Sequence, residues 1–247
     1  VRDVKTCTSD DFLHWSEPVW LDYGDAPETH LYTNQIMPYP RAPHLLIGFP
    51  TRFLPDRDSL TESLLMTSRD GRRFHRWDEA WIRPGPNPAR WHNRSNYVWY
   101  GMLQTPSAMP GAPDALSFYS NEHYYGAGGG RIRRYTLRMD GFVSVSAGYD
   151  GGTLVTRPLI TDGRRLTLNV STAAAGSVRV ELQRIDGKAL PGFALDDCDP
   201  FYGDALEHTV HWHGSPEIPR LSGRPIRLRV VLRDADLYAL QFWGLEA

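Results

Sequence analysis

A short turn motif that occurs twice places the strongest constraint on how this chain folds. Residues 8–17 and 67–79 each contain a Ser, a turn-forming Asp, an aromatic residue and a Trp-x-Glu triplet. The two tryptophans, Trp15 and Trp77, are 62 residues apart. An Asp side chain at this position stabilises a tight turn, and the Trp can pack across the two flanking strands. The repeat therefore predicts two copies of a β-hairpin unit.

Short apolar runs separated by Pro and Gly occupy the rest of the first half. They lie at residues 31–36, 44–49, 63–68, 95–101, 116–122 and 131–137. No window of about 11 residues or more has the 3.6-residue apolar period of a helix. Three or four short strands in roughly 60 residues match one blade of a β-propeller. We therefore expect two to three blades within residues 1–147.

The strands alternate more regularly in the second half of the chain. A glycine-rich segment at 148–152 has the composition of a linker, and alternating runs follow it at 153–158, 165–171, 177–183, 207–212, 226–232 and 237–242. Six or more strands in about 100 residues predict a β-sandwich over residues 148–247. The predicted fold class is all-β, with a partial β-propeller followed by a β-sandwich.

The net charge, the apolar runs and the cysteines of the chain bear on its possible partners and compartment. A formal net charge of -2 provides no positive field for nucleic acid or an anionic membrane. No apolar run reaches the roughly 18 residues of a membrane helix. The chain does not begin with Met, so we expect it to be a piece of a longer protein, which leaves its compartment unknown. Cys7 and Cys198 fall in different predicted domains and are expected to be free thiols.

The hairpin motifs carry a resemblance to known enzymes. The pattern Ser-x-Asp-Phe-x-x-Trp at residues 9–15, followed by Glu17-Pro18-Val19, resembles the blade hairpin of propeller glycoside hydrolases of the fructosidase and arabinanase type. The second copy, at residues 68–74, is similar to the Asp-box of sialidases, with Phe74 at the aromatic position. In the fructosidase group a five-bladed propeller precedes a β-sandwich. The resemblance thus implies the same order of domains here, and a secreted or periplasmic location if the protein hydrolyses glycans.

Two departures from that family matter. Two or three blades are fewer than the four that a closed propeller needs. An N-terminal half outside this sequence, or self-association with another chain, is therefore expected to complete the ring. The Asn-Asp-Pro-Asn-Gly and Arg-Asp-Pro motifs of the fructosidases are absent, so the resemblance implies that at least one catalytic carboxylate lies outside these residues.

Three carboxylates are candidates for catalysis, because most glycoside hydrolases use two of them around the scissile bond. Glu122 ranks first, since its aromatic surroundings predict a burial that raises its pKa towards that of a general acid. Asp58 and Glu62 lie on a polar segment ahead of a strand. The alternative for all three is a solvated or structural carboxylate. The acids of the repeated hairpins are predicted to be structural: Asp10, Asp11, Glu17, Asp70 and Glu79.

Two groups of residues are candidates for substrate binding. Trp91, Asn93, Arg94 and Asn96 combine a ring for stacking on a sugar with amide and guanidinium groups for its hydroxyls. Arg41, His44 and Arg52 lie near the ends of neighbouring predicted strands, where an arginine can bind a carboxylate or hydroxyl groups. Packing and ion pairs between blades are the competing interpretation of both groups.

The sequence predicts no cofactor and no metal ligand set. His211 and His213 would share one face of a strand, but no third ligand accompanies them. The acid-rich segment 196–199, with Asp204, offers oxygen ligands for calcium, although its spacing matches no EF-hand. An acidic turn explains the same residues.

We expect a glycoside hydrolase-like protein that acts on a glycan through carboxylate acid/base chemistry, hydrolysing O-glycosyl bonds. The expected partner is a carbohydrate substrate, with neither nucleic acid nor membrane. The alternatives are a non-catalytic carbohydrate-binding protein and a propeller that serves as an interaction scaffold. Much of this expectation rests on analogy between folds, and one fold can carry many functions.

Overall fold

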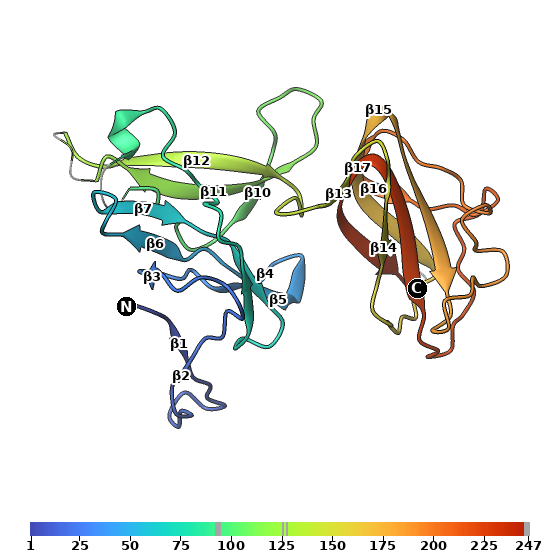
Figure 1. Ribbon diagram of the computed structural model, residues 1–247, viewed down its shortest axis with the longest axis horizontal. Coiled ribbons are helices and arrows are strands. Elements are labelled where there is room, and N and C mark those ends of the chain that lie inside the picture. The colour runs from blue at the N-terminus through green and yellow to red at the C-terminus, as the bar shows by residue number, and fades with distance from the viewer. Residues whose placement is uncertain (92–94, 125, 127, 245–247) are drawn as a thin grey trace. The chain divides into compact units, whose positions relative to one another are not determined.

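A computed structural model describes residues 1–91, 95–124, 126 and 128–244, and it is all-β (Figure 1). The single helical element among the described residues is a 3-10 turn, η1, at Pro88–Arg90. No described helix has the length and apolar character needed to cross a membrane. The chain divides into two compact units, residues 1–136 and 137–247. The predicted all-β class, with blade-like sheets followed by a sandwich-like unit, is confirmed.

The central blade of the first unit is built from strands that bend midway. One half is the sheet β3-β6-β7, and the other half is the sheet β4-β5-β8-β9. Their bounds are His30–Leu31 (β3), Met37–Tyr39 (β4), Ala42–Gly48 (β5), Thr51–Leu54 (β6), Leu60–Ser63 (β7), Met66–Ser68 (β8) and Phe74–Arg76 (β9). Hydrogen bonds bridge the bends, from Phe49 N to Asn34 O at 2.8 Å and from Leu64 N to Pro50 O at 2.8 Å. Pro50 has no N–H to donate, which accounts for the break between β5 and β6.

A second blade follows in the chain. It contains β10 (Leu103–Thr105), β11 (Ala115–Glu122) and β12 (Arg131–Arg138) in the order β10-β11-β12. The segment before β10 extends the sheet, because Asn96 N donates to Asn121 O and Trp99 N donates to Tyr119 O, both at 2.8 Å. The short pair β1 (Lys5–Thr6) and β2 (Val19–Trp20) forms a separate hairpin at the start of the chain.

The two hairpin turns predicted from the repeat have the same hydrogen bonds. In the first, Asp11 Oδ1 accepts from the backbone N–H of Leu13 and His14, both at 2.8 Å. In the second, Asp70 Oδ1 accepts from the backbone N–H of Arg72 at 2.9 Å and of Arg73 at 2.8 Å. The pKa of Asp11 is lowered first by a hydrogen bond with the His14 side chain and then by these backbone hydrogen bonds, whereas the backbone hydrogen bonds are the main cause that lowers the pKa of Asp70. The structural role predicted for these two acids is confirmed.

An aromatic cluster joins the central and second blades. Phe49 stacks on Phe118 with ring centroids 6.0 Å apart, and Trp81 lies 6.2 Å from the same ring. Tyr135 also stacks on Phe118, with ring centroids 6.0 Å apart. Large rings bury much apolar area and favour such pairings. The cluster therefore fixes how the strands that carry the site lie against each other.

The second unit is one antiparallel sheet that curls around its own core. Its strands are β13 (Val145–Ala147), β14 (Gly152–Val155), β15 (Arg165–Gln183), β16 (Asp204–Thr209) and β17 (Arg227–Trp243), in the order β13-β17-β15-β16 with β14 beside β17. The register of β15 with β17 shifts between Thr172 and Ser177, where Asp234 has a φ of 47°. Bulges of this kind bend a sheet. Consequently, Leu168 and Val180, on opposite sides of the shift, belong to one core.

Two expectations about the domain boundary differ from the structure. The second unit begins at Leu137, earlier than the expected boundary at 147, because β13 pairs with β17. Arg138 also binds within this unit, to Asn169 Oδ1 at 2.7 Å and to Ala205 O at 2.8 Å. The glycine-rich segment 148–152 is the turn between β13 and β14 and does not connect the two units.

Candidate functional site

A pocket of about 650 Å³ opens in the first unit beside the β6–β7 hairpin. It is lined by Arg52, Arg57, Leu60, Glu62, Asp78, Glu79, Ala80, Arg83, Pro84, Gly85 and Trp91. Three of these residues, Arg52, Glu62 and Trp91, are among the site residues predicted from the sequence. The volume lies in the usual range for small-ligand sites.

Arg52 holds two carboxylates in the wall of this pocket. It faces Glu62 across the β6–β7 ladder, and its Nη2 donates to Glu62 Oε2 at 2.7 Å. Its Nη1 donates to Asp78 Oδ1 at 3.0 Å and to the Asp78 carbonyl at 2.9 Å. Arg52 and Glu62 are nearly buried, whereas 51% of the Asp78 side chain is exposed. One guanidinium therefore fixes two carboxylates, one of which faces solvent.

Trp91 stands at the rim of the pocket with its ring half-exposed. Its side chain is 55% exposed, yet its Nε1 donates to Gly85 O at 2.7 Å, which fixes the ring. Arg57 and Arg83 are exposed and also line the pocket. An anchored indole beside guanidinium and carboxylate groups can stack on the apolar face of a sugar while they bind its hydroxyls.

Asp58, Arg41 and His44 do not line this pocket. Asp58 lies in the exposed turn between β6 and β7 with a φ of 57°, so it caps the hairpin that carries Glu62. Arg41 and His44 belong to the β4–β5 hairpin of the other half of the blade and are exposed. The structure thus separates these two residues from Arg52, although the three are close in sequence.

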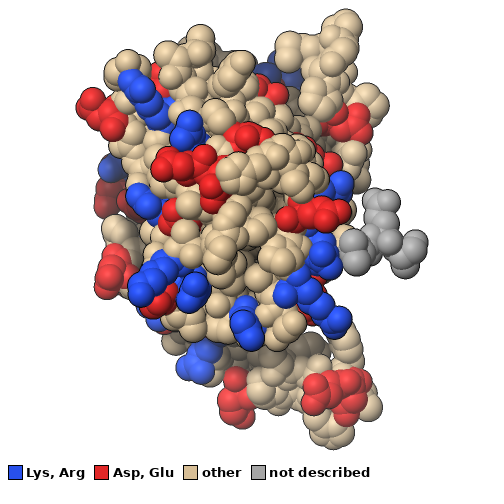
Figure 2. Space-filling view, turned by 90° about the vertical axis from the view of Figure 1, so that its right-hand side faces the viewer, with Lys and Arg blue, Asp and Glu red and all other residues tan. Residues whose placement is uncertain are grey.

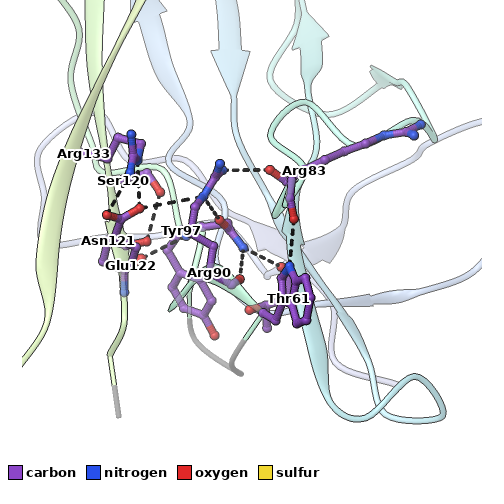
Figure 3. Close-up of polar contacts among 11 residues, drawn as sticks. Thr61, Arg83, Arg90, Tyr97, Ser120, Asn121, Glu122 and Arg133 are labelled. Carbon is purple, nitrogen blue, oxygen red and sulfur yellow. Dashed lines mark hydrogen bonds and ion pairs between the residues drawn. The ribbon is translucent and has the colours of Figure 1, made fainter. Parts of the chain in front are cut away.

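Glu122 lies in a polar network between the central and second blades (Figure 3). It is buried and accepts two hydrogen bonds from Arg133, from Nε at 2.8 Å and from Nη2 at 3.1 Å. Arg90 Nε lies 3.8 Å from the same carboxylate. These arginines outweigh burial and hold the pKa of Glu122 below its usual value. The predicted rise in its pKa is therefore wrong, because sequence proximity to aromatic residues did not reveal the arginine partners.

Asn96 belongs to the same network and is fully buried. Its Nδ2 donates to Arg90 O at 2.9 Å, and its Oδ1 accepts from Arg90 Nε at 3.1 Å. Arg90 Nη2 donates in turn to Arg83 O at 2.7 Å. Buried in this way, Asn96 positions Arg90 and cannot contact a sugar in the pocket. Asn93 and Arg94, predicted alongside it, lie outside the described residues.

Sequence reasoning missed Asp78 and Arg90. Asp78 directly follows Trp77 in the second hairpin motif, and Arg90 directly precedes Trp91. In both places the sequence pattern assigned a role to the tryptophan and none to the charged residue beside it. Arg52 and Asp78 are brought together by hydrogen bonds that pair the segment after β9 with β7, such as Trp81 N to Ser63 O at 2.6 Å. No local pattern in the sequence encodes that pairing.

The acid-rich segment of the second unit gives no support for a calcium site. Asp197 Oδ2 accepts from Ala194 N at 2.9 Å, and its other oxygen pairs with His213 Nε2 at 2.8 Å. Asp199 Oδ2 accepts from Gly214 N at 2.9 Å, and Asp204 pairs with Arg138. Within the described part of the chain, no group of three or more His, Cys, Asp or Glu side chains could hold a metal ion.

Comparisons with known proteins do not assign this chain to a family. No protein-family model matches the sequence, and no curated protein matches it. Among solved structures, a fructofuranosidase variant from Schwanniomyces occidentalis in complex with fructosylnystose matches 96% of this chain and 87% of its own chain. The two share 7% sequence identity and a TM-score of 0.27. A match at this level is too weak to define a function.

Proposed function

We propose that the protein binds a glycan in the first-unit pocket and hydrolyses it with Glu62 and Asp78. The observation that carries the proposal is the bridging of these two carboxylates by Arg52 in the wall of a pocket whose rim holds Trp91. An ordered indole and paired carboxylates are the elements that sugar binding and glycoside hydrolysis use.

The shared arginine supports a hydrolytic role for the two carboxylates. Arg52 holds both of them in the wall of one pocket, and most glycoside hydrolases use a pair of carboxylates around the scissile bond. In the proposed reaction, one of the two carboxyl groups donates a proton to the glycosidic oxygen as the bond to the anomeric carbon breaks. The other, as a carboxylate, accepts a proton from the water whose oxygen attacks that carbon.

A second candidate is glycan binding without hydrolysis. The observation in its favour is that both carboxylates already form ion pairs with Arg52, as structural carboxylates do. In that case Trp91 and the exposed Arg57 and Arg83 would hold the sugar, and no bond would be cleaved.

The experiment that tests the proposal combines two assays. Nitrophenyl glycosides and a panel of neutral oligosaccharides serve as hydrolysis substrates, and a glycan array measures binding. The variants are Glu62→Gln, Asp78→Asn and Trp91→Ala. Trp99→Ala is the matched control, because Trp99 is a similarly exposed indole of the same unit that does not line the pocket.

We expect Trp91→Ala to weaken binding about tenfold, since stacking on an aromatic ring contributes on the order of 1–2 kcal/mol. Glu62→Gln and Asp78→Asn should lower hydrolysis at least about a hundredfold while binding is retained. Binding without hydrolysis in the wild type would support the second candidate. Equal losses in Trp99→Ala and Trp91→Ala, or no glycan bound at all, would refute the placement of the site.

A further inference from the structure

The second unit contains a pocket of its own, of about 770 Å³, which the proposed function does not use. It lies between the segment that follows β15 and the segment that precedes β17. Its walls come from residues 184–193 and 219–226. The two strands meet at the pairing of Gln183 with Arg227, so both walls start from one fixed point of the sheet.

Backbone hydrogen bonds hold both walls in place. Arg184 N donates to Lys188 O at 2.8 Å, and Leu190 N donates to Leu182 O at 2.7 Å. On the other wall, Arg224 N donates to Leu221 O at 2.9 Å. Three prolines in the lining, Pro191, Pro219 and Pro225, further restrict the backbone. The pocket is therefore preformed, which lowers the entropy lost when a ligand binds.

The floor of the pocket is apolar and continuous with the core of the unit. Leu221 and Ile226 are buried core residues, and Leu190 and Phe193 pack against that core. Phe193 is further fixed by Trp212, whose ring centroid lies 5.1 Å from its own. Such a floor suits a ligand that presents a flat face of C–H groups.

The charged groups of this pocket are all basic. Arg184, Arg220 and Arg224 line it and are exposed, and no acidic residue is among its described lining residues. Within the described chain, none of the three forms an ion pair with a carboxylate. The protein as a whole has a net charge of -2, and Figure 2 shows acidic and basic side chains interspersed over one face. Around this pocket, by contrast, the three described guanidinium groups have no carboxylate partner, so they give the pocket a local positive charge.

We infer that this pocket binds an acidic sugar, with its anionic group held by the three arginines and its ring face on the floor near Phe193. Guanidinium groups bind carboxylate and sulfate through paired hydrogen bonds, and a pyranose ring supplies the apolar face. The anion follows from the arginines alone, whereas the sugar rests on the proposed function.

Titration calorimetry on the full chain tests this inference with three probes. These are a tetragalacturonate, its neutral methyl ester and a sulfated tetrasaccharide, so that carboxylate and sulfate sources are compared directly. The variants are Arg220→Gln with Arg224→Gln, singly and together. Arg157→Gln is the control, because Arg157 is an exposed arginine of the same unit outside the pocket. A thermal melt of each variant establishes that it is folded.

We expect at least one of the two acidic probes to bind, and the neutral ester to bind at least about tenfold more weakly. Each arginine substitution should raise Kd about tenfold, and added salt should raise it further. Equal binding of the neutral ester, equal effects of Arg157→Gln, or no binding of either acidic probe would overturn the inference. Trp91→Ala should leave this binding unchanged, so failure here is distinguishable from failure of the first-unit site.

Discussion

Replacing Glu122 by Gln should destabilise the first unit. The carboxylate is buried and accepts two hydrogen bonds from Arg133, and hydrogen bonds to charged groups contribute about 1.5–3 kcal/mol each. The Arg133 side chain is 42% exposed, so solvent screens part of this interaction. Gln keeps one acceptor and turns an N–H group towards the guanidinium. We therefore expect a loss of about 2–3 kcal/mol.

The pH dependence of this loss follows from the direction of the pKa shift. The pKa of Glu122 is lower in the folded protein than in the unfolded chain, where it is about 4.3. Its stabilising contribution is therefore fully present above about pH 5 and disappears as pH falls through the folded-state pKa. The gap between wild type and Glu122→Gln should be widest near pH 7 and should close at strongly acidic pH.

Differential scanning calorimetry of the wild type and the variant measures this effect as a difference in Tm. A loss of 2–3 kcal/mol corresponds to a decrease of about 5–10 °C in the Tm of the first unit. Glu17→Gln is the control, because it removes one exposed carboxylate from the same unit. Equal Tm values for Glu122→Gln and wild type at pH 7, or a gap that widens in acid, would refute the reasoning.

Three further predictions concern the second unit and the thiols. Gly176→Ala should lower the Tm of the second unit, since an added Cβ would lie 2.5 Å from a backbone oxygen, whereas Gly148→Ala, with open space around its Cβ, should leave it unchanged. Arg138→Ala should cost the same unit about 2 kcal/mol in urea unfolding, because Arg138 donates to four acceptors of one unit; unaltered unfolding would contradict this. In the native protein a thiol reagent should label the exposed Cys7 and spare Cys198, whose pKa burial raises; rapid labelling of both would argue against the buried position.

Local features of the fold could be predicted from the sequence. The Ser-x-Asp turns form from hydrogen bonds within a few residues, so Ser68 and Asp70 encode their hairpin wherever it lies. The turn at Asp186-Gly187 is equally local, since Gly187 has a φ of 84° that favours glycine. The alternation of apolar residues predicted strands at 226–232 and 237–242, because a strand buried on one face has a period of two, and the structure joins the two runs in the single strand β17.

Contacts between distant parts of the chain bring the pocket residues together and set the direction of the pKa shift of Glu122. Arg52 and Asp78, 26 residues apart, meet only because the segment after β9 pairs with β7. The aromatic neighbours of Glu122 predicted a raised pKa, but Arg133 on β12 and Arg90 in η1 lower it. Coulomb and hydrogen-bond energies depend on distances through space, which strand pairing sets. Local residue patterns encode most strands and turns of this protein, whereas the packing of those strands sets which charged side chains meet.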